Sequence, residues 1–289
     1  MKTCNVIGAG RVGRTLAALW ASHRTFAIQD VLDRTIEGAR TAVEFIGQGT
    51  PIDGPQAVRA ADVWMLTTPD SRIAQACDQL AGWGVLRAGD IVFHCSGTLG
   101  ADQLHAAATA GALTASVHPL KTFADPSAAR RTFAGTYCAA EGDAVAIAVL
   151  TRALEDIGAR VANIDPQHKT LYHAASVIVC NYLAALLETG LRCYEQAGLP
   201  RATALQMIEP IVRETVQNVF ALGPAGALTG PIARGDESVV MRHVDALTKW
   251  QPQVAQIYRE LGVVAVQLAR EQSSVHDAAL DRLEALLKP

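Results

Sequence analysis

The chain has 289 residues, with 28 acidic and 25 basic side chains and a formal net charge of −3 at pH 7. Half of its residues are hydrophobic and 18% are charged, which excludes a disordered chain and is typical of a globular protein. No basic cluster is present in the sequence, so we expect neither nucleic acid nor an anionic membrane surface as a partner. This length allows two domains, each with its own hydrophobic core.

Six cysteines are scattered along the chain without a C-x-x-C spacing, and the histidines show no H-E-x-x-H spacing. We therefore predict no metal site and no disulfide framework. Reduced thiols, together with an apolar segment that leaves no room for a signal peptide, predict a cytoplasmic protein. The longest apolar run, 174–187, is interrupted by Asn181 and is too short to span a bilayer, so we expect a buried helix there.

The first half of the chain alternates short β-type runs with helical stretches. The runs cover residues 4–7, 26–32, 62–67, 90–95, 113–117, 136–140 and 160–164, and helical patterns cover 11–22, 36–46, 71–83, 101–110 and 144–157. This alternation predicts an α/β class domain with a doubly wound parallel sheet.

Helical periodicity replaces this alternation after Asp165-Pro166. Candidate helices cover residues 167–197, 201–221, 236–248, 251–272 and 277–287, and Gly- and Pro-rich segments separate them. The sequence therefore predicts a Rossmann domain over residues 1–165 and an all-α domain over residues 166–289.

The first predicted strand ends in the turn Gly8-Ala9-Gly10-Arg11-Val12-Gly13, which opens the first predicted helix. In this context the G-x-G-x-x-G spacing indicates a dinucleotide site. The first glycine permits a tight turn, the second lets the backbone approach the diphosphate, and the third lets the helix pack on the strand. Free backbone N–H groups at the helix N-terminus then bind the diphosphate.

Asp33 and Arg34 follow the second predicted strand and favour different nicotinamide cofactors. An acidic residue twenty positions after Gly13 accepts hydrogen bonds from a ribose diol, which favours NAD. An arginine beside it clamps a 2′-phosphate, which favours NADP. We predict an NAD(P) cofactor, with a slight preference for NADP.

Polar residues also follow two later strands, as Thr67-Thr68-Pro69-Asp70 and as Cys95-Ser96-Gly97. Ligands of open α/β sheets bind at the carboxyl ends of the strands, so we assign both segments to the cofactor. Asp70 is either a cofactor ligand or the N-cap of the next helix. Cys95 has no basic neighbour identifiable in the sequence, so we do not expect it to be a nucleophile.

His173 is the first candidate for acid–base catalysis, because an unperturbed imidazole titrates near neutral pH. It lies within about 60° of Lys169, Ser176 and Cys180 on the first helix of the second half, at 100° per residue. A hydrogen-bonded structural histidine is the alternative. Asn181 must find a partner, either a substrate or a facing helix. Lys169 lies near the helix start, where we expect it to be solvated.

Four further residues are candidates for the substrate side of the site. His118 and Lys121 follow the strand at 113–117, where His118 can contact the nicotinamide or the substrate and Lys121 a substrate carboxylate. Thr229 and Arg234 lie on a Gly- and Pro-rich connection that can close the site. Arg234 either clamps a carboxylate or pairs with Asp236.

The order of glycine turn, T-T-P-D strand end and helical second half resembles the 6-phosphogluconate-dehydrogenase-like superfamily. Within it, the chain looks most like the Rossmann-like oxidoreductases related to pyrroline-5-carboxylate reductase and to deazaflavin-dependent NADP reductases. The more specific segments are residues 118–123, 172–175 with Asn181, and 228–236. His118-Pro119 is also similar to the H-P turn of prephenate dehydrogenases.

The segment 228–236 is similar in position to the T-S-P-G-G-T segment of pyrroline-5-carboxylate reductases. Thr229 and Pro231 match it, whereas residues 234–236 depart from it and residues 174–177 replace the reductases' S-G-S-G-P segment. The resemblance implies the two-domain architecture and a homodimer formed by interlocking helical domains.

Together these features predict an NAD(P)-dependent oxidoreductase. It would transfer hydride between nicotinamide and the C–O or C–N centre of a small, anionic substrate, the anionic preference resting on Lys121 and Arg234. Two alternatives stay open: an imine reductase of the pyrroline-5-carboxylate type, and an NADPH-binding sensor or assembly protein without turnover.

Overall fold

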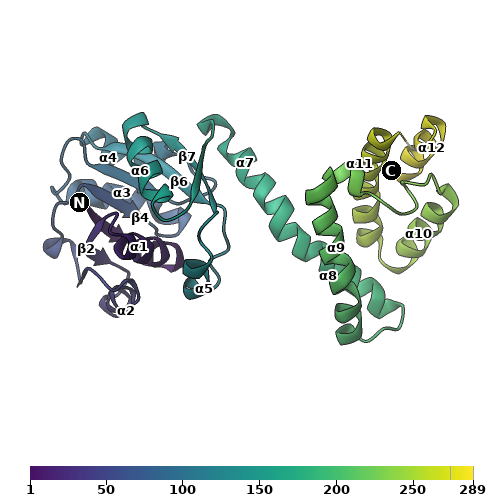
Figure 1. Cartoon of the computed structure of the whole chain (residues 1–289), viewed down its shortest axis with the longest axis horizontal. Helices are drawn as coiled ribbons and strands as arrows, with labels where there is room; N and C mark the ends of the chain where they lie inside the picture. The colour runs from purple at the N-terminus through teal and green to yellow at the C-terminus, as the bar shows by residue number, and fades with distance from the viewer. Residues whose placement is uncertain (274, 289) are drawn as a thin grey trace. The chain divides into compact units, whose positions relative to one another are not determined.

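The computed structural model describes residues 1–273 and 275–288. The chain divides into two compact units, Met1–Asn181 and Tyr182–Pro289. Figure 1 shows the strands and their covering helices in the first unit and helices alone in the second. The predicted fold class, a Rossmann domain followed by a helical region, is confirmed.

An eight-stranded sheet forms the centre of the first unit. Its strands are β1 (Thr3–Ile7), β2 (Ala27–Leu32), β3 (Thr50–Ile52), β4 (Val63–Leu66), β5 (Ile91–His94), β6 (Leu113–Pro119), β7 (Tyr137–Gly142) and β8 (Arg160–Asn163). They lie in the order β3-β2-β1-β4-β5-β6-β7-β8. The first six of these have the strand order of a dinucleotide-binding Rossmann sheet, with the switch point between β1 and β4.

The sheet differs from the predicted one in two strands. The three-residue strand β3 was missed, because it is short and contains Pro51 at the sheet edge. The predicted doubly wound parallel sheet has one exception, since β7 runs antiparallel to β6. The Leu120 N–H donates to the Tyr137 carbonyl at 2.8 Å, so the chain re-enters the sheet beside the end of β6. A strand that starts at that edge can only run antiparallel.

Helices cover both faces of the sheet. They are α1 (Arg11–His23), α2 (Ile36–Ile46), α3 (Ile73–Gly82), α4 (His105–Thr109), α5 (Pro126–Arg131) and α6 (Ala144–Glu155). Alternate residues of β4 serve the two faces: Val63 and Met65 pack in one core with α1 and α6, and Trp64 and Leu66 in the other with α3 and α4. Burial on both faces is typical of strands in a doubly wound sheet.

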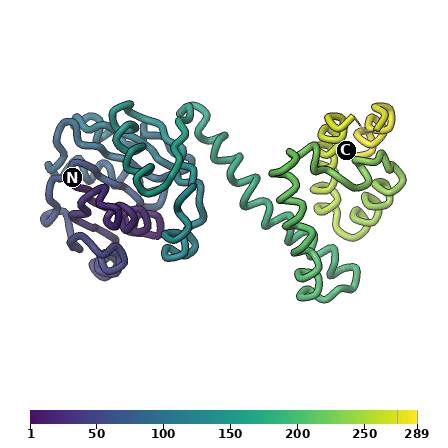
Figure 2. Tube along the Cα trace, viewed as in Figure 1, coloured from purple at the N-terminus to yellow at the C-terminus, as the bar shows by residue number. Residues whose placement is uncertain are grey.

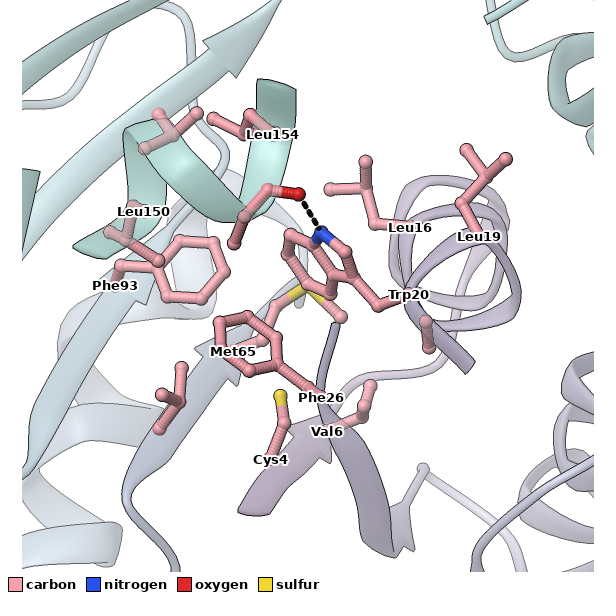
Figure 3. Packing of buried hydrophobic residues seen from close by; sticks show 14 of the residues in the cluster. Cys4, Val6, Leu16, Leu19, Trp20, Phe26, Met65, Phe93, Leu150 and Leu154 are labelled. Atoms are coloured by element: carbon pink, nitrogen blue, oxygen red, sulfur yellow. Dashed lines mark hydrogen bonds between the residues drawn. The ribbon is translucent and has the colours of Figure 1, made fainter. Parts of the chain in front are cut away.

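Trp20 of α1 is the centre of the larger core (Figure 3). Its ring is fully buried and lies edge-to-face with Phe26 and Phe93, at centroid distances of 5.1 and 6.1 Å. The indole N–H donates to the Ala153 carbonyl of α6 at 2.8 Å. This bond satisfies the indole N–H and joins α1 to α6 across the core.

The helices after β8 form an irregular series. They are α7 (Lys169–Ser176), a π-helical turn (Val177–Asn181), α8 (Tyr182–Gln196), α9 (Arg201–Ala227), α10 (Glu237–Trp250), α11 (Pro252–Gln272) and α12 (Asp277–Leu287). The α9 segment contains one non-helical residue, Gly223, with φ of +77°. Figure 2 follows the trace from α9 into the last three helices. Their core contains Val240, Val266 and Leu283.

We had predicted that the helix over residues 167–197 is buried. This prediction was wrong, because large apolar side chains along it are exposed. Leu171, Val179 and Tyr182 are 69%, 67% and 62% exposed in the single chain. The continuous helix Pro166–Gln196 is also long and apolar enough to cross a membrane, by length and composition alone. Helices that are covered by protein meet the same criterion.

The two compact units meet at a different residue from the predicted boundary. The sequence placed that boundary at residue 165, just after β8. The first unit extends to Asn181 because the start of α7 is anchored in the sheet: Lys169 is 2% exposed.

Candidate functional site

The glycine turn lies at the switch point of the sheet, between the ends of β1 and β4. Gly8 has φ of +83°, and a Cβ atom there would lie 2.7 Å from the Thr68 nitrogen. A Cβ at Gly13 would lie 2.2 Å from Thr67 Oγ1, and this hydroxyl donates to the Gly8 carbonyl at 2.6 Å. The first and third glycines of the motif are therefore required by close packing against β4.

Gly10 has a different reason to lack a side chain. A Cβ there would have no protein atom closer than 4.0 Å, so the residue faces open space. Gly10 is the N-cap of α1 and makes no side-chain cap bond, which leaves the N–H groups of the first turn to a ligand. Arg11 and Val12 form that first turn, as predicted.

A cavity of about 700 Å³ adjoins this turn and is lined by Gly8, Gly10, Asp33, Arg34, Thr67, Thr68 and Pro69, as well as by Arg72 and Gln75. Seven of the fifteen predicted cofactor residues are thus brought together around one cavity. Thr68 Oγ1 is buried and has no hydrogen-bond partner within the described residues. A buried hydroxyl without a partner on a cavity wall fits a site that a polar ligand completes.

Asp33 and Arg34 both line the cavity. The structure is therefore compatible with NAD, which Asp33 favours, and with NADP, which Arg34 favours. Asp33 is half-buried and accepts from the Arg34 N–H at 2.9 Å, while the Arg34 side chain is exposed. Arg72 was missed by the sequence reading, although it lies only two residues past the T-T-P-D segment. Its Nη1 donates to Gln75 Oε1 at 2.7 Å, and both residues line the cavity.

Two histidines meet over Gly97, at the carboxyl ends of β5 and β6. A Cβ at Gly97 would lie 2.3 Å from His173 Cδ2 and 2.9 Å from His118 Nε2. The two imidazole centroids are 5.7 Å apart. Tyr172 O–H lies 3.0 Å from His118 Nδ1, and the Thr98 hydroxyl lies 2.9 Å from His173 Nδ1. We call His118, Tyr172, His173 and Thr98 the histidine cluster.

Ser96 organises the loop that carries Thr98. Its hydroxyl donates to Asp70 at 2.7 Å and accepts from the N–H groups of Thr98 and Leu99 at 3.2 and 3.0 Å. The alternative reading of Asp70 as a helix N-cap was wrong, because Pro69 and Arg72 occupy the cap positions of the two helical segments that follow. Asp70 instead fixes the Ser96 hydroxyl beside the histidine cluster.

Burial keeps His118 of the histidine cluster uncharged. Burial, followed by the neighbouring charges of His173 and Lys169, lowers the pKa of His118 to about 4. Burial also raises the pKa of Tyr172 to about 12. At neutral pH, Tyr172 therefore donates to a neutral His118 at Nδ1, which leaves the imidazole proton on Nε2.

Cys95 packs against the large core. Burial raises the pKa of its thiol, so it carries no thiolate at neutral pH. This agrees with our expectation that it is not a nucleophile.

The remaining predicted residues have other surroundings within their own units. Lys121 Nζ donates to the Thr132 carbonyl at 2.7 Å, and Asn181 is exposed at the end of the first unit. Thr229 and Arg234 belong to the second unit. Thr229 lines an apolar cavity of about 450 Å³ there, and Arg234 pairs with Asp236 at 3.3 Å, the alternative we had left open.

The sequence reading was wrong about Lys169, which is buried rather than solvated. Its ammonium contacts Glu141 and Ser116, two side chains that the sequence reading did not select. It also missed Tyr172 and Thr98, although Tyr172 lies inside one of the quoted segments. Tyr172 could have been selected because it directly precedes His173 on the same predicted helix.

Two family models match the chain. A Rossmann-like domain matches residues 2–119, and a domain of unknown function, DUF2520, matches residues 136–264. The two matches follow each other along the chain, and each covers less than half of it. No curated protein sequence matches it.

Solved structures with the same architecture include oxidoreductases. A Thermotoga maritima protein is 24% identical with a TM-score of 0.74, over 94% of this chain and 100% of that chain. A candidate NADP oxidoreductase of Bacteroides fragilis is 23% identical with a TM-score of 0.65, over 93% and 98%. A pyrroline-5-carboxylate reductase of Coxiella burnetii is 16% identical with a TM-score of 0.59, over 100% and 99%.

These likenesses show the fold, and they bear out the resemblance that the sequence suggested. Imine reductases and reductive aminases share it, and among these neighbours one structure holds NADP and another NADPH.

The depressed pKa of His118 predicts a loss of stability in acid. An unfolded histidine titrates near pH 6.5, so the unfolded chain binds the extra proton first as the pH falls. The contribution of neutral His118 to the free energy of unfolding is fully present above about pH 6.5 and is lost as the pH falls to about 4. The total is about 3 kcal/mol in the free energy of unfolding.

Urea unfolding of the wild type and of His118→Gln at pH 7 and pH 4.5 measures the contribution of His118 to the free energy of unfolding. The variant should lose less free energy of unfolding between the two pH values, whereas the exposed His168→Gln control should lose as much as the wild type. An equal loss in His118→Gln and wild type would contradict the assignment.

Proposed function

We propose that the protein is an NAD(P)-dependent oxidoreductase that acts on the C–O or C–N centre of a small substrate. The observation that carries the proposal is that two features lie at the same edge of the sheet. One is the glycine turn with its cavity, and the other is the histidine cluster at the ends of β5 and β6. Ligands of this class of sheet bind at that edge. The fold of the solved neighbours supports the same activity.

The chain's own residues fit a dinucleotide. The N–H groups after Gly10 bind a diphosphate, and Asp33 accepts from a ribose hydroxyl. Arg34 and Arg72, which both line the cavity, supply positive charge for a 2′-phosphate. On this ground we propose NADP in preference to NAD.

The histidine cluster supplies the proton chemistry. The bound nicotinamide would donate or accept the hydride. Neutral His118, held by Tyr172, presents its Nε2–H as a hydrogen-bond donor to a substrate oxygen or nitrogen. His173, oriented by Thr98, gives the proton to that atom in reduction or takes it in oxidation.

The predicted preference for an anionic substrate is not carried into this proposal. That preference rested on Lys121 and Arg234. Lys121 is bonded to a backbone carbonyl, and Arg234 is paired with Asp236. We therefore propose no charge preference, and carbonyl and imine substrates of both kinds belong in the assay.

Arg34→Ala tests the cofactor preference by fluorescence titration with NADPH and NADH. Loss of a charge-assisted contact to a 2′-phosphate should raise the Kd for NADPH by about tenfold or more and leave the Kd for NADH within twofold. Arg40→Ala is the matched control, because Arg40 is exposed on α2, the helix that follows Arg34, and is not among the residues that line the cavity. Equal weakening of both cofactors would refute the 2′-phosphate role.

His173→Gln tests the proton-transfer role in a 340-nm assay with a panel of small ketones, aldehydes and cyclic imines. We expect kcat to fall by about 100-fold, the usual share of a general acid or base, while the Kd for NADPH stays within twofold. The control is His168→Gln, an exposed histidine at the same helix start. Tight NADPH binding by a wild type that turns over nothing in the panel would instead favour a sensor.

We also propose that the helical segment forms a homodimer. Exposed apolar side chains support it, because such patches on a soluble protein mark interaction sites. On α9, Phe220 is 86% exposed and Ile211 is 62% exposed. The interlocked dimers implied by the resemblance would cover such residues.

Sedimentation equilibrium of Ile211→Asp measures this proposal. A buried unpaired carboxylate disfavours association, so the variant should sediment near the chain mass of 30.6 kDa and the wild type near twice that mass. Gln217→Asp adds the same charge at an exposed polar position of α9 and should stay dimeric. A monomeric wild type would refute the proposal.

A further inference from the structure

A buried ion pair lies beneath the histidine cluster and takes no part in the proposed proton transfer. Lys169 Nζ and Glu141 Oε1 are 2.8 Å apart, and their side chains are 2% and 4% exposed. Lys169 is the first residue of α7, one helical turn before His173. Glu141 is on β7, in the sheet. The pair therefore ties the helix that carries His173 to the sheet that carries His118.

One carboxylate oxygen accepts hydrogen bonds from both segments that form the Thr98–His173 contact, which are α7 and the loop of Thr98. Glu141 Oε1 accepts from Lys169 Nζ at 2.8 Å and from the Ala101 N–H at 3.0 Å. Ala101 ends the loop that carries Thr98, three residues earlier. The two partners of the contact are thus anchored to the same atom, so their separation follows from the position of Glu141.

The sheet positions Glu141 through a cross-strand neighbour. Ser116 of β6 lies directly opposite Glu141 in the antiparallel ladder, and its hydroxyl accepts from Lys169 Nζ. The same hydroxyl lies 3.3 Å from His94 Nδ1, and the fully buried His94 donates from Nε2 to the Gly100 carbonyl at 2.9 Å. The loop is therefore held at both of its final residues, Gly100 and Ala101.

We propose that Glu141 is a positioning residue of the proposed active site, which acts through Lys169 and Ala101 to hold His173 against Thr98 and His118. This inference rests on the proposed function for its consequence in catalysis. Replacing a buried ion pair by apolar residues is often neutral or stabilising, so stability alone gives little reason for the pair. Fixing one arrangement of a helix and a loop is a purpose that an apolar contact serves less well, because apolar contacts are not directional.

Glu141→Gln in the full chain tests the proposal by NMR of 13C-labelled histidine. Loss of the anchor should loosen α7 and expose His118, whose pKa should rise by at least one unit from about 4 toward 6.5. Charge alone predicts the opposite sign, because removing a carboxylate makes the surroundings more positive and lowers a histidine pKa. The groups that face His118 are His173, Lys169, Asp70 and Tyr172. None of them is substituted, but Lys169 loses the carboxylate that raises its own pKa, so the Thr98–His173 contact is the readout that separates loosening from a change of charge.

Three further measurements complete the test. The through-space NMR contact between the Thr98 methyl group and the His173 ring should weaken in Glu141→Gln, with the Kd for NADPH within twofold. Any turnover found with the substrate panel should fall by at least tenfold in kcat. Glu37→Gln, which breaks an exposed pair of α2, should change none of these.

The double variant Lys169→Met/Glu141→Leu serves if the single variant does not fold. It leaves no buried charge unpaired, so it should keep a thermal midpoint within a few degrees of wild type while the Thr98–His173 contact weakens. The proposal would be overturned if either variant kept the wild-type pKa of His118 and an intact Thr98–His173 contact. These readouts need no substrate, so an inactive wild type would refute the proposed function and leave the positioning role to be judged separately.

Discussion

At the carboxyl edge of the sheet, two glycines stand where any side chain would collide with a neighbour. A Cβ at Gly13 would overlap Thr67, and a Cβ at Gly97 would overlap His173. The first contact brings α1 close enough to β4 for its N-terminal N–H groups to face the cavity. The second lets two imidazoles from different elements approach over one loop. Both halves of the candidate site therefore depend on the same constraint, which is close backbone approach at this edge.

Local patterns gave the strands, the glycine turn and the first cofactor residues, because each depends on contacts between neighbours in sequence. The burial of Lys169 does not. It depends on Glu141 and Ser116 being opposite each other, and this pairing exists only because β7 runs antiparallel to β6. A sequence reading that assumed a parallel strand had no means to bring these side chains together, so a lysine at a helix start was expected in solvent.

The apolar first helix illustrates a second limit of sequence patterns. Apolar residues around the whole circumference indicate burial, yet they do not say which surface covers the helix. In the single chain, Leu171 and Val179 remain exposed. The prediction of burial within the chain failed for this reason, and the same pattern is the physical basis for proposing that a second copy covers the helices.

The π-helical turn at Val177–Asn181 separates the residues that join the site from those that do not. An extra residue in a helical turn shifts the phase of everything after it, and such turns are frequent at functional sites. A phase of 100° per residue correctly grouped Lys169 with His173 on the side of α7 that meets the sheet. From the turn onward that phase no longer applies, and Cys180 and Asn181, which lie within it, are exposed. The turn therefore ends the part of the helix that the sheet positions, and the residues proposed for proton transfer all lie before it.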